Sequence, residues 1–362
     1  VVLTLIVRAA CALGARAARP GEFSERAFLN NRIDLAQAEA IADLIDAGSM
    51  EAARAAQRSL EGVLSRRVDA LAEALIGLRV YIEGALDFSD EDVDWLGTAA
   101  LTDKLAHARA QLDELLREAD QGRRLREGFI VALTGRPNVG KSTLLNRLAG
   151  ADVAIVTDIA GTTRDVLRED IQLRGLPLTL VDTAGLRDSE DPIEREGIRR
   201  ARHALEHAEL ALFLIDAREQ LTAADHQLLA GLPAALPRVV VHNKIDLVAT
   251  TPQRVESDGC VHLHLSAATG AGIELLVDEI LRAAGLQTGE HNSFSARSRH
   301  VDALRRAQAH LAQAAQRLGT RTLPELAAEE LRLGQEALGE ITGRFGSEAL
   351  LGRIFAGFCI GK

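Results

Sequence analysis

Residues 135–143 have the types and spacing needed to bind phosphate groups. They read Gly-Arg-Pro-Asn-Val-Gly-Lys-Ser-Thr, which fits the pattern G-x-x-x-x-G-K-[ST]. The glycines let the backbone N–H groups converge on phosphate oxygens, the lysine supplies a positive charge, and the serine hydroxyl can ligate Mg²⁺. An apolar run precedes the motif and a stretch with helical spacing follows it, as the motif requires. The predicted nucleotide contacts are Gly135, Asn138, Val139, Gly140, Lys141, Ser142 and Thr143.

A second motif, Asp-Thr-Ala-Gly at residues 182–185, follows the apolar run 178–181. Asp182 can hold Mg²⁺ through water, and the Gly185 N–H can meet the γ-phosphate. The loop before it contains Thr163, our choice for completing the Mg²⁺ shell. Arg164 fits either an arginine finger or a local salt bridge with Asp165.

Two further motifs predict which base is bound. Asn243 and Lys244 begin the motif Asn-Lys-Ile-Asp, in which the carboxylate of Asp246 can accept from the N1–H and amino group of guanine, whereas adenine presents an acceptor at that edge. Ser266 and Ala267 follow another apolar run and suit a backbone contact with the base O6. Four motifs in this order, each at the end of a strand, predict a GTP site.

The residue after the Asp-Thr-Ala-Gly motif is Leu186, where many GTPases carry a glutamine that orients water. Leucine cannot do this, so hydrolysis needs another group to orient water and a cation near the β–γ bridge. The candidates for orienting water are the acids downstream, although most of them fit solvated acids that stabilise the start of a helix. These acids are Asp188, Glu190, Asp191, Glu194 and Glu196.

Composition limits the class of protein. The 362 residues are 47% hydrophobic and 26% charged, with a net charge of −10, and no stretch is apolar for long enough to cross a bilayer. The charge argues against indiscriminate polyanion binding.

Residues 1–7 resemble a signal sequence but lack a basic start, and we expect the natural N-terminus to be missing. Three dispersed cysteines fit a reducing cytoplasm, so we expect a cytoplasmic protein.

The flanks of the nucleotide motifs have helical patterns. Asp34 is a plausible N-cap for a helix over 35–46, and one long helix is predicted over 49–85, with a narrow apolar seam. Further helices are expected over 101–119 and 301–358, the latter with a break near 343–346. Composition predicts a surface loop over 1–30. The acidic run 87–94 fits a metal site or a helix-capping loop.

Between these flanks, short apolar strands alternate with helical stretches, which is typical of a doubly wound, mostly parallel sheet. The strands are expected at 129–133, 178–181, 210–215, 238–242 and 261–265. The predicted fold class is therefore an α/β P-loop GTPase domain inserted into an all-α helical domain. The predicted domains are residues 1–30, 31–121 (helical, first part), 122–287 (GTPase) and 288–362 (helical, second part).

Several of these segments together resemble the MnmE (TrmE) family of tRNA-modification GTPases. They are 19–30 (Arg-Pro-Gly-Glu-Phe-Ser-Glu-Arg-Ala-Phe-Leu-Asn), 35–40, the phosphate loop, 157–165, 182–187 and the final Cys-Ile-Gly-Lys at 359–362. The resemblance covers essentially the whole chain. It implies that 1–30 are the remnant of an N-terminal folate-binding domain.

The resemblance also implies a potassium-activated hydrolysis of GTP. Asn138 and the carbonyls of Thr157, Ile159 and Thr162 would hold K⁺, and two GTPase domains would pair in a homodimer. Glu194 would orient the attacking water indirectly, and Arg187 would support the second switch.

For the modification itself, the resemblance implies an FAD-dependent partner subunit, tRNA with its wobble uridine as the substrate, and a one-carbon tetrahydrofolate. The residues assigned to that site are Arg26, Asn30, Cys359 and Lys362. A partly buried free thiol is the alternative interpretation of Cys359. Alternatives for the whole chain are a ribosome-assembly GTPase switch and a nucleotide-gated scaffold.

Overall fold

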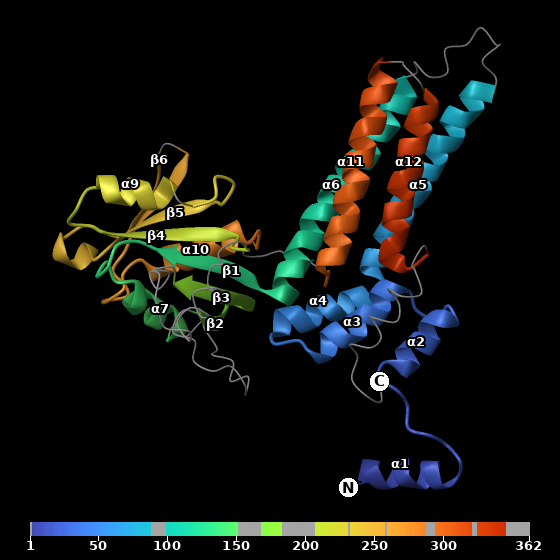
Figure 1. The fold of residues 1–362 in the computed structure, drawn as a ribbon, viewed down its shortest axis with the longest axis horizontal. Coiled ribbons are helices and arrows are strands. Elements are labelled where there is room, and N and C mark those ends of the chain that lie inside the picture. Colours follow the sequence, from blue (N-terminus) through green and yellow to red (C-terminus); the bar gives the residue numbers. More distant parts are fainter. Residues whose placement is uncertain are drawn as a thin grey trace, which may run out of the picture. The chain divides into compact units, whose positions relative to one another are not determined.

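The computed structural model describes residues 2–87, 99–150, 168–182, 207–230, 232–257, 259–286, 294–320 and 324–344. The chain forms two compact units, one made of residues 1–126 and 292–362 and the other of residues 127–291 (Figure 1). The second unit contains the sheet and interrupts the first, which is helical. This confirms the predicted fold class.

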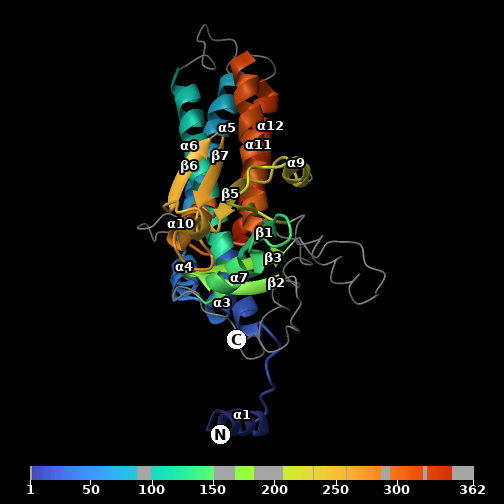
Figure 2. The same ribbon diagram turned by 90° about the vertical axis from the view of Figure 1, so that its left-hand side faces the viewer.

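In the helical unit, four long helices lie side by side (Figures 1 and 2). They are α5 (Val63–Asp87), α6 (Ala99–Glu127), α11 (Ser298–Thr320) and α12 (Pro324–Thr342). The predicted seam of α5, from Leu64 to Ile82, is buried and packs with leucines and alanines of the other three helices. The seam is therefore confirmed, and it joins the two flanks of the chain into one core.

The predicted long helix over 49–85 is wrong, because the chain breaks it into α4 (Met50–Leu60) and α5. Gly62 adopts a φ of +80°, a left-handed conformation that ends a helix. The Gln37 side chain donates to the Leu60 carbonyl over 2.9 Å, so one of the carbonyls left open at the end of α4 is satisfied. The spacing of apolar residues alone does not reveal this break between α4 and α5.

The N-terminal cap of α3 (Leu35–Ile45) follows the sequence pattern. The Gln37 N–H donates to the Asp34 carboxylate over 2.8 Å, and the Asp34 N–H donates to the Gln37 side chain over 3.0 Å. This reciprocal capping box confirms Asp34 as the N-cap.

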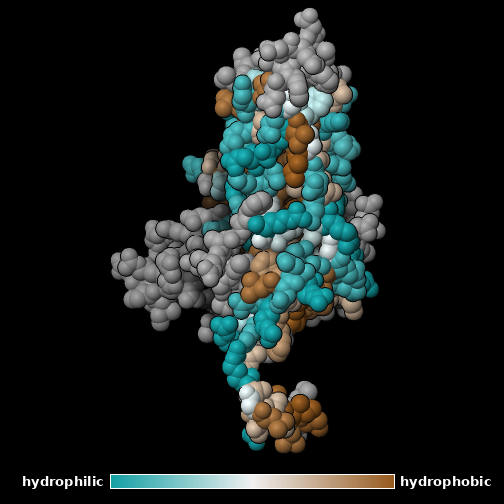
Figure 3. Space-filling model, turned by 90° about the vertical axis from the view of Figure 1, so that its right-hand side faces the viewer, coloured by the Kyte–Doolittle hydropathy of each residue, from teal (hydrophilic) through white to brown (hydrophobic). Residues whose placement is uncertain are grey.

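The predicted loop over 1–30 is also wrong, since it contains α1 (Val2–Ala12) and α2 (Glu22–Leu29). Leu5 and Ile6 of α1 are more than half exposed, and the apolar side chains of α1 form the brown surface at the foot of Figure 3. The turn before α2 is fixed by Glu22, which pairs with the Arg16 guanidinium and accepts the Arg19 N–H over 2.8 Å. These contacts are ionic and local, so they produce no apolar periodicity in the sequence from which α2 could be predicted.

The helix α6 runs through the predicted domain boundary at 121/122. Arg123 and Arg124 pair with Asp120, one turn earlier on the same helix, over 3.0 and 2.9 Å. Gly122 packs so tightly that a Cβ atom would lie 1.9 Å from the Phe294 carbonyl oxygen. This segment is therefore helical, and the units divide after Arg126.

Within the described residues, the α/β unit contains a seven-stranded sheet with the order β2-β3-β1-β4-β5-β7-β6. Its five central strands are parallel and match the predicted runs: β1 (Phe129–Thr134), β3 (Leu176–Asp182), β4 (Leu210–Asp216), β5 (Arg238–Asn243) and β7 (Cys260–His264). The edge strands β2 (Arg168–Leu173) and β6 (Gln253–Ser257) are antiparallel to their neighbours and were not predicted. β6 is exposed along its whole length, so it carries no apolar run.

Helices bury side chains on both faces of this sheet. α7 (Lys141–Ala149) and α10 (Ile273–Ala283) pack against one face, and α9 (Ala223–Ala230) contributes Leu229 to the other. The strand order reverses at β1, which has β3 on one side and β4 on the other. Ligands of such sheets bind at this reversal, beyond the carboxyl ends of the strands. In the described part of the chain, none of the helices has the length and apolarity to span a bilayer.

Candidate nucleotide-binding site

The phosphate loop joins β1 to α7 at the point where the strand order reverses. Gly135 and Gly140 have φ values of +138° and +99°, which favour glycine. A Cβ atom on Gly135 would lie 2.3 Å from the Leu214 carbonyl oxygen, and one on Gly140 would lie 2.3 Å from the Asn243 Nδ2. Both glycines are therefore required by the space as well as by the backbone angle.

Lys141, the lysine of the motif, is 7% exposed and its side chain turns back into the loop. Its Nζ donates to the Gly135 and Arg136 carbonyls over 2.9 and 3.0 Å. Ser142 and Thr143 follow in the first turn of α7 and are exposed. A lysine charge at the N-terminus of a helix is an arrangement that favours binding of an anion.

Asn243 and Lys244 at the end of β5 hold the second half of the loop. Asn243 donates from Nδ2 to the Val139 carbonyl over 2.8 Å, and Lys244 donates from Nζ to the Asn138 carbonyl over 2.7 Å. Lys244 has a φ of +69°, which turns the chain into the short helix η2 (Ile245–Leu247). The last residue of the motif, Asp246, lies in η2 with its side chain exposed.

The loop after β7 is joined to the same asparagine. The Ala267 N–H donates to the Asn243 Oδ1 over 2.9 Å, and the Ser266 N–H donates to the Ala271 carbonyl over 2.8 Å. Arg147 of α7 donates to the Ala267 carbonyl over 3.0 Å. The backbone N–H groups of Ser266 and Ala267, which we expected to contact the base O6, are therefore both bonded within the protein. The sequence does not show these bonds.

Two aspartates end neighbouring strands at this edge. Asp182 ends β3 and lies in register with Leu133 of β1. Asp216 ends β4, is 5% exposed, and accepts from Lys244 Nζ and Arg218 Nη2 over 2.8 Å each. The bonds from Arg218 and then Lys244 hold the pKa of Asp216 below its usual range, although burial opposes this.

Sequence reasoning missed Asp216, although a signal was present. It follows an apolar strand in the same way as Asp182 and Asn243 do, and the parallel sheet brings all three positions to one edge. Through Lys244, its charge is linked to the phosphate loop.

Several predicted residues lie outside the described part of the structure. For hydrolysis and the cations these are Thr157, Ile159, Thr162, Thr163, Gly185, Arg187 and Glu194, and for the folate site Cys359 and Lys362. Arg26 and Asn30, at the end of α2, are exposed, and the Asn30 side chain donates to the Arg26 carbonyl over 2.6 Å. Within the described ranges, no group of three or more His, Cys, Asp or Glu side chains is arranged to hold a metal ion.

A phosphate loop at the switch point of a mostly parallel sheet, joined to an Asn-Lys-x-Asp motif at the end of a neighbouring strand, defines a P-loop GTPase. The order of the strands and the bonds made by Asn243 and Lys244 provide both features.

The family model and the sequences of relatives agree with this class. A family model of the MnmE helical domain matches residues 35–359. The tRNA modification GTPase MnmE of Methylococcus capsulatus is 57% identical over 363 residues, covering 100% of this chain and 80% of that protein. The protein of the same name from Yersinia pseudotuberculosis is 51% identical over 367 residues, covering 100% and 81%. A structure of an Aquifex aeolicus Era variant bound to GDP and AlF4⁻ is 28% identical, covers 50% of this chain and 66% of that one, and has a TM-score of 0.32. The chain belongs to the MnmE family of tRNA modification GTPases.

Proposed function

We propose that this chain binds GTP and Mg²⁺ and hydrolyses GTP to GDP and phosphate as part of tRNA modification. The observation that carries the proposal is the pair of bonds from Asn243 and Lys244 to the phosphate loop. They join the end of β5, where the motif that would read guanine begins, to the loop that would hold the phosphates. The names of the relatives, which are tRNA modification GTPases, support the second part of the proposal.

Three of the described motifs would have a role in binding. Lys141 would turn part of its donor capacity from the loop carbonyls to the β- and γ-phosphates. Ser142 and Asp182 would hold Mg²⁺, directly and through water, and the exposed carboxylate of Asp246 would bind the guanine edge. The space around Gly135 and Gly140 supports this, because a Cβ atom at either position would clash with Leu214 or Asn243 and the loop could not keep this conformation.

For hydrolysis, we propose K⁺ as the cation near the β–γ bridge. Asn138 would be one ligand: its carbonyl is already bonded to Lys244, but its side chain is exposed and can bind a cation. The other ligands would be the carbonyls of Thr157, Ile159 and Thr162, supplied as two GTPase domains pair in a homodimer.

Glu194 would orient the attacking water indirectly and so replace the glutamine that many GTPases carry at the position of Leu186. Thr163 would complete the Mg²⁺ shell and Arg187 would support the switch. All of these lie outside the described residues.

We further propose that the chain acts with an FAD-dependent subunit on the wobble uridine of tRNA in the cytoplasm, using a one-carbon tetrahydrofolate. Arg26, Asn30, Cys359 and Lys362 would serve that site. These roles rest on the sequence resemblance and on family membership.

The test is the rate of GTP turnover by the full chain in matched KCl and NaCl buffers. We expect KCl to raise kcat at least tenfold. A cation at the β–γ bridge would take the place of an arginine finger, which raises kcat about 10³–10⁵-fold. Asn138→Ala should remove the stimulation by KCl. Equal slow rates in both salts would contradict the K⁺ site, and a chain that binds no GDP would contradict the proposed function.

A further inference from the structure

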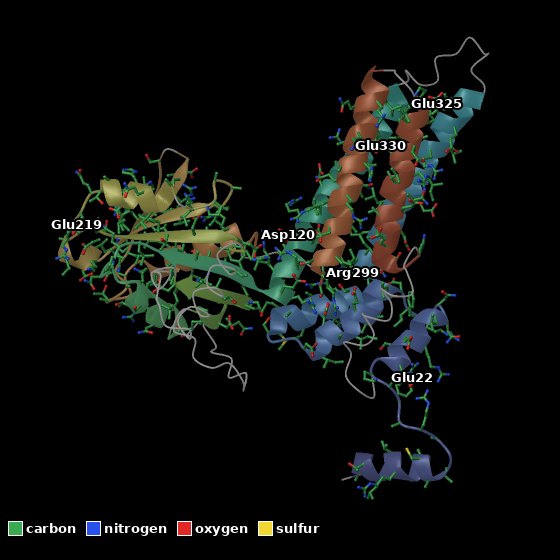
Figure 4. All side chains as sticks on the ribbon, viewed as in Figure 1. Glu22, Asp120, Glu219, Arg299, Glu325 and Glu330 are labelled. Carbon is green, nitrogen blue, oxygen red and sulfur yellow. The ribbon has the colours of Figure 1, made fainter. Side chains whose placement is uncertain are left out.

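The second residue of the phosphate loop, Arg136, sends its side chain out of the loop toward the start of α9. Its Nε donates to the Asp225 Oδ1 over 2.9 Å, and its Nη2 bonds to the carboxylate of Glu219. Asp225 is fully buried, whereas the Glu219 side chain is 51% exposed and lies at the surface of the α/β unit (Figure 4). Of these two partners, the buried one should hold Arg136 more firmly.

The Asp225 carboxylate has a position that does not depend on Arg136. Its Oδ2 accepts from the Thr222 N–H over 2.9 Å and from the Thr222 hydroxyl over 2.7 Å. The Asp225 N–H in turn lies 3.3 Å from the Thr222 hydroxyl, which completes a capping box at the start of α9. The acceptor that faces the phosphate loop is therefore built into a helix terminus.

The two halves of the loop are held by different partners. The second half is tied to the end of β5 through Asn243 and Lys244. The first half is tied by the Lys141 bonds to the carbonyls of Gly135 and Arg136, and by Arg136 to α9. A bound nucleotide competes for the donors of Lys141, so the bond from Arg136 has to hold this half when the phosphates arrive.

We infer that Arg136 and Asp225 form a positioning pair that keeps the first turn of the phosphate loop in its binding conformation. The inference rests on the proposed nucleotide site and adds to it two residues that none of the motif roles includes. Neither residue needs to contact the nucleotide. The pair acts through the backbone of Gly135 and Arg136.

The experiment measures the Kd for GDP, with magnesium, on the full chain and four variants. Asp225→Asn keeps the shape and the oxygen that accepts from Thr222 but removes the charge that faces Arg136, and Arg136→Gln removes the other partner. We expect each to raise Kd about tenfold, the size of effect of one hydrogen bond to a charged group. The double variant should be no worse than either single one, because the two residues act through one contact.

Glu219→Gln is the matched control, since it removes the exposed partner of the same arginine, and its Kd should stay within about threefold of wild type. Thermal unfolding of the nucleotide-free forms separates positioning from folding. A purely structural role would lower the melting temperature and leave Kd unchanged.

Unchanged or tighter GDP binding by Asp225→Asn, or additive losses in the double variant, would overturn the inference. Arg136→Lys keeps a charge for Asp225 and should recover most of the affinity that Arg136→Gln loses; no recovery would also count against it. Failure of the wild-type chain to bind GDP would instead remove the proposed function, so the two outcomes are distinct.

Discussion

Single residues decide whether the phosphate loop can form. Gly140 is the N-cap of α7 with a left-handed backbone, and its missing Cβ leaves room for the Asn243 side chain. The sequence motif predicts that glycine is needed here but not what it contacts. The contact is long-range, since 103 positions separate residues 140 and 243, and no local pattern encodes it.

Gly140→Ala is expected to abolish measurable GDP binding. The added methyl group would lie 2.3 Å from the Asn243 Nδ2 and would have to displace the side chain that joins the loop to β5 and to Ala267. Isothermal titration with GDP measures this. Gly259→Ala is the control: Gly259 also has a positive φ, +71°, but open space around its Cβ position. It should cost about 1 kcal/mol of stability and keep GDP affinity. Gly140→Ala binding GDP like wild type would contradict the role of the contact.

Three histidines on one face of the sheet should make the α/β unit sensitive to acid. The His242 Nε2 lies 3.1 Å from the His262 Nδ1, and the rings of His242 and His264 stack at 4.3 Å. Burial, and then the neighbouring His264 and His262, lower the pKa of His242 to about 4, and burial also lowers the pKa of His264. The folded state thus binds fewer protons than the unfolded state between about pH 6.5 and 4.

The free energy of unfolding should therefore fall as the pH drops through this window, by up to roughly 3 kcal/mol from His242, and should not change for this reason above it. His242→Gln should show a smaller loss between pH 7 and 5 in urea unfolding. The exposed His226→Gln is the control and should follow wild type. Identical pH curves for His242→Gln and wild type would show that the cluster has no such effect.

At the scale of helices and strands, the sequence predicts the features that depend on the local spacing of apolar residues. It does not predict helix ends and edge strands that depend on contacts with residues far away in the sequence. The seam of α5 and the cap at Asp34 follow from spacing and residue type alone. The end of α4 at Gly62 and the extension of α6 past 122 depend on Gln37 and on the close approach of Phe294. In the site, the motif positions could be predicted, while Asp216 and the bond from Arg136 to Asp225 required the sheet order and the position of α9.

One element-scale prediction concerns Glu39, which joins α3 to α11. It is 1% exposed and accepts from Arg299 Nε and Nη2 over 2.8 and 2.5 Å and from His300 over 2.9 Å. Arg299 lies near the lower end of the long helices in Figure 4. Burial opposes ionisation of Glu39, but His300 and Arg299 hold its pKa below the usual range. Glu39→Gln should destabilise the helical unit by about 3 kcal/mol, because it leaves a desolvated guanidinium without its anion.

Glu340→Gln is the matched control, since Glu340 pairs with Arg306 at a side-chain exposure of 37% and 52%. It should cost less than about 1 kcal/mol. Urea unfolding followed by circular dichroism measures both variants. Equal losses in the two would show that burial of the Glu39 network adds no stability.

At the scale of the whole molecule, the chain leaves the helical unit after Arg126, and Phe294 is its first described residue after the return. Asp43 of α3 holds both of these segments: it accepts from Arg126 and Ser295 over 2.6 Å each and from Arg297 over 2.7 Å. All of these contacts lie within the helical unit, so the two segments are joined without any residue of the sheet. The cores of the two units likewise share no residues.

We therefore expect calorimetry of the full chain to show two unfolding transitions, of which GDP shifts only one. A ligand at 100 times its Kd stabilises the unit that binds it by about 2.7 kcal/mol, and a unit without the site gains nothing unless the two unfold together. Glu39→Gln should lower the other transition and leave the GDP-sensitive one in place, so ligand and variant identify the transitions independently. A single transition moved by both GDP and Glu39→Gln would mean that the inserted domain and its helical host unfold as one cooperative unit. Nucleotide binding would then act on the stability of the helices directly.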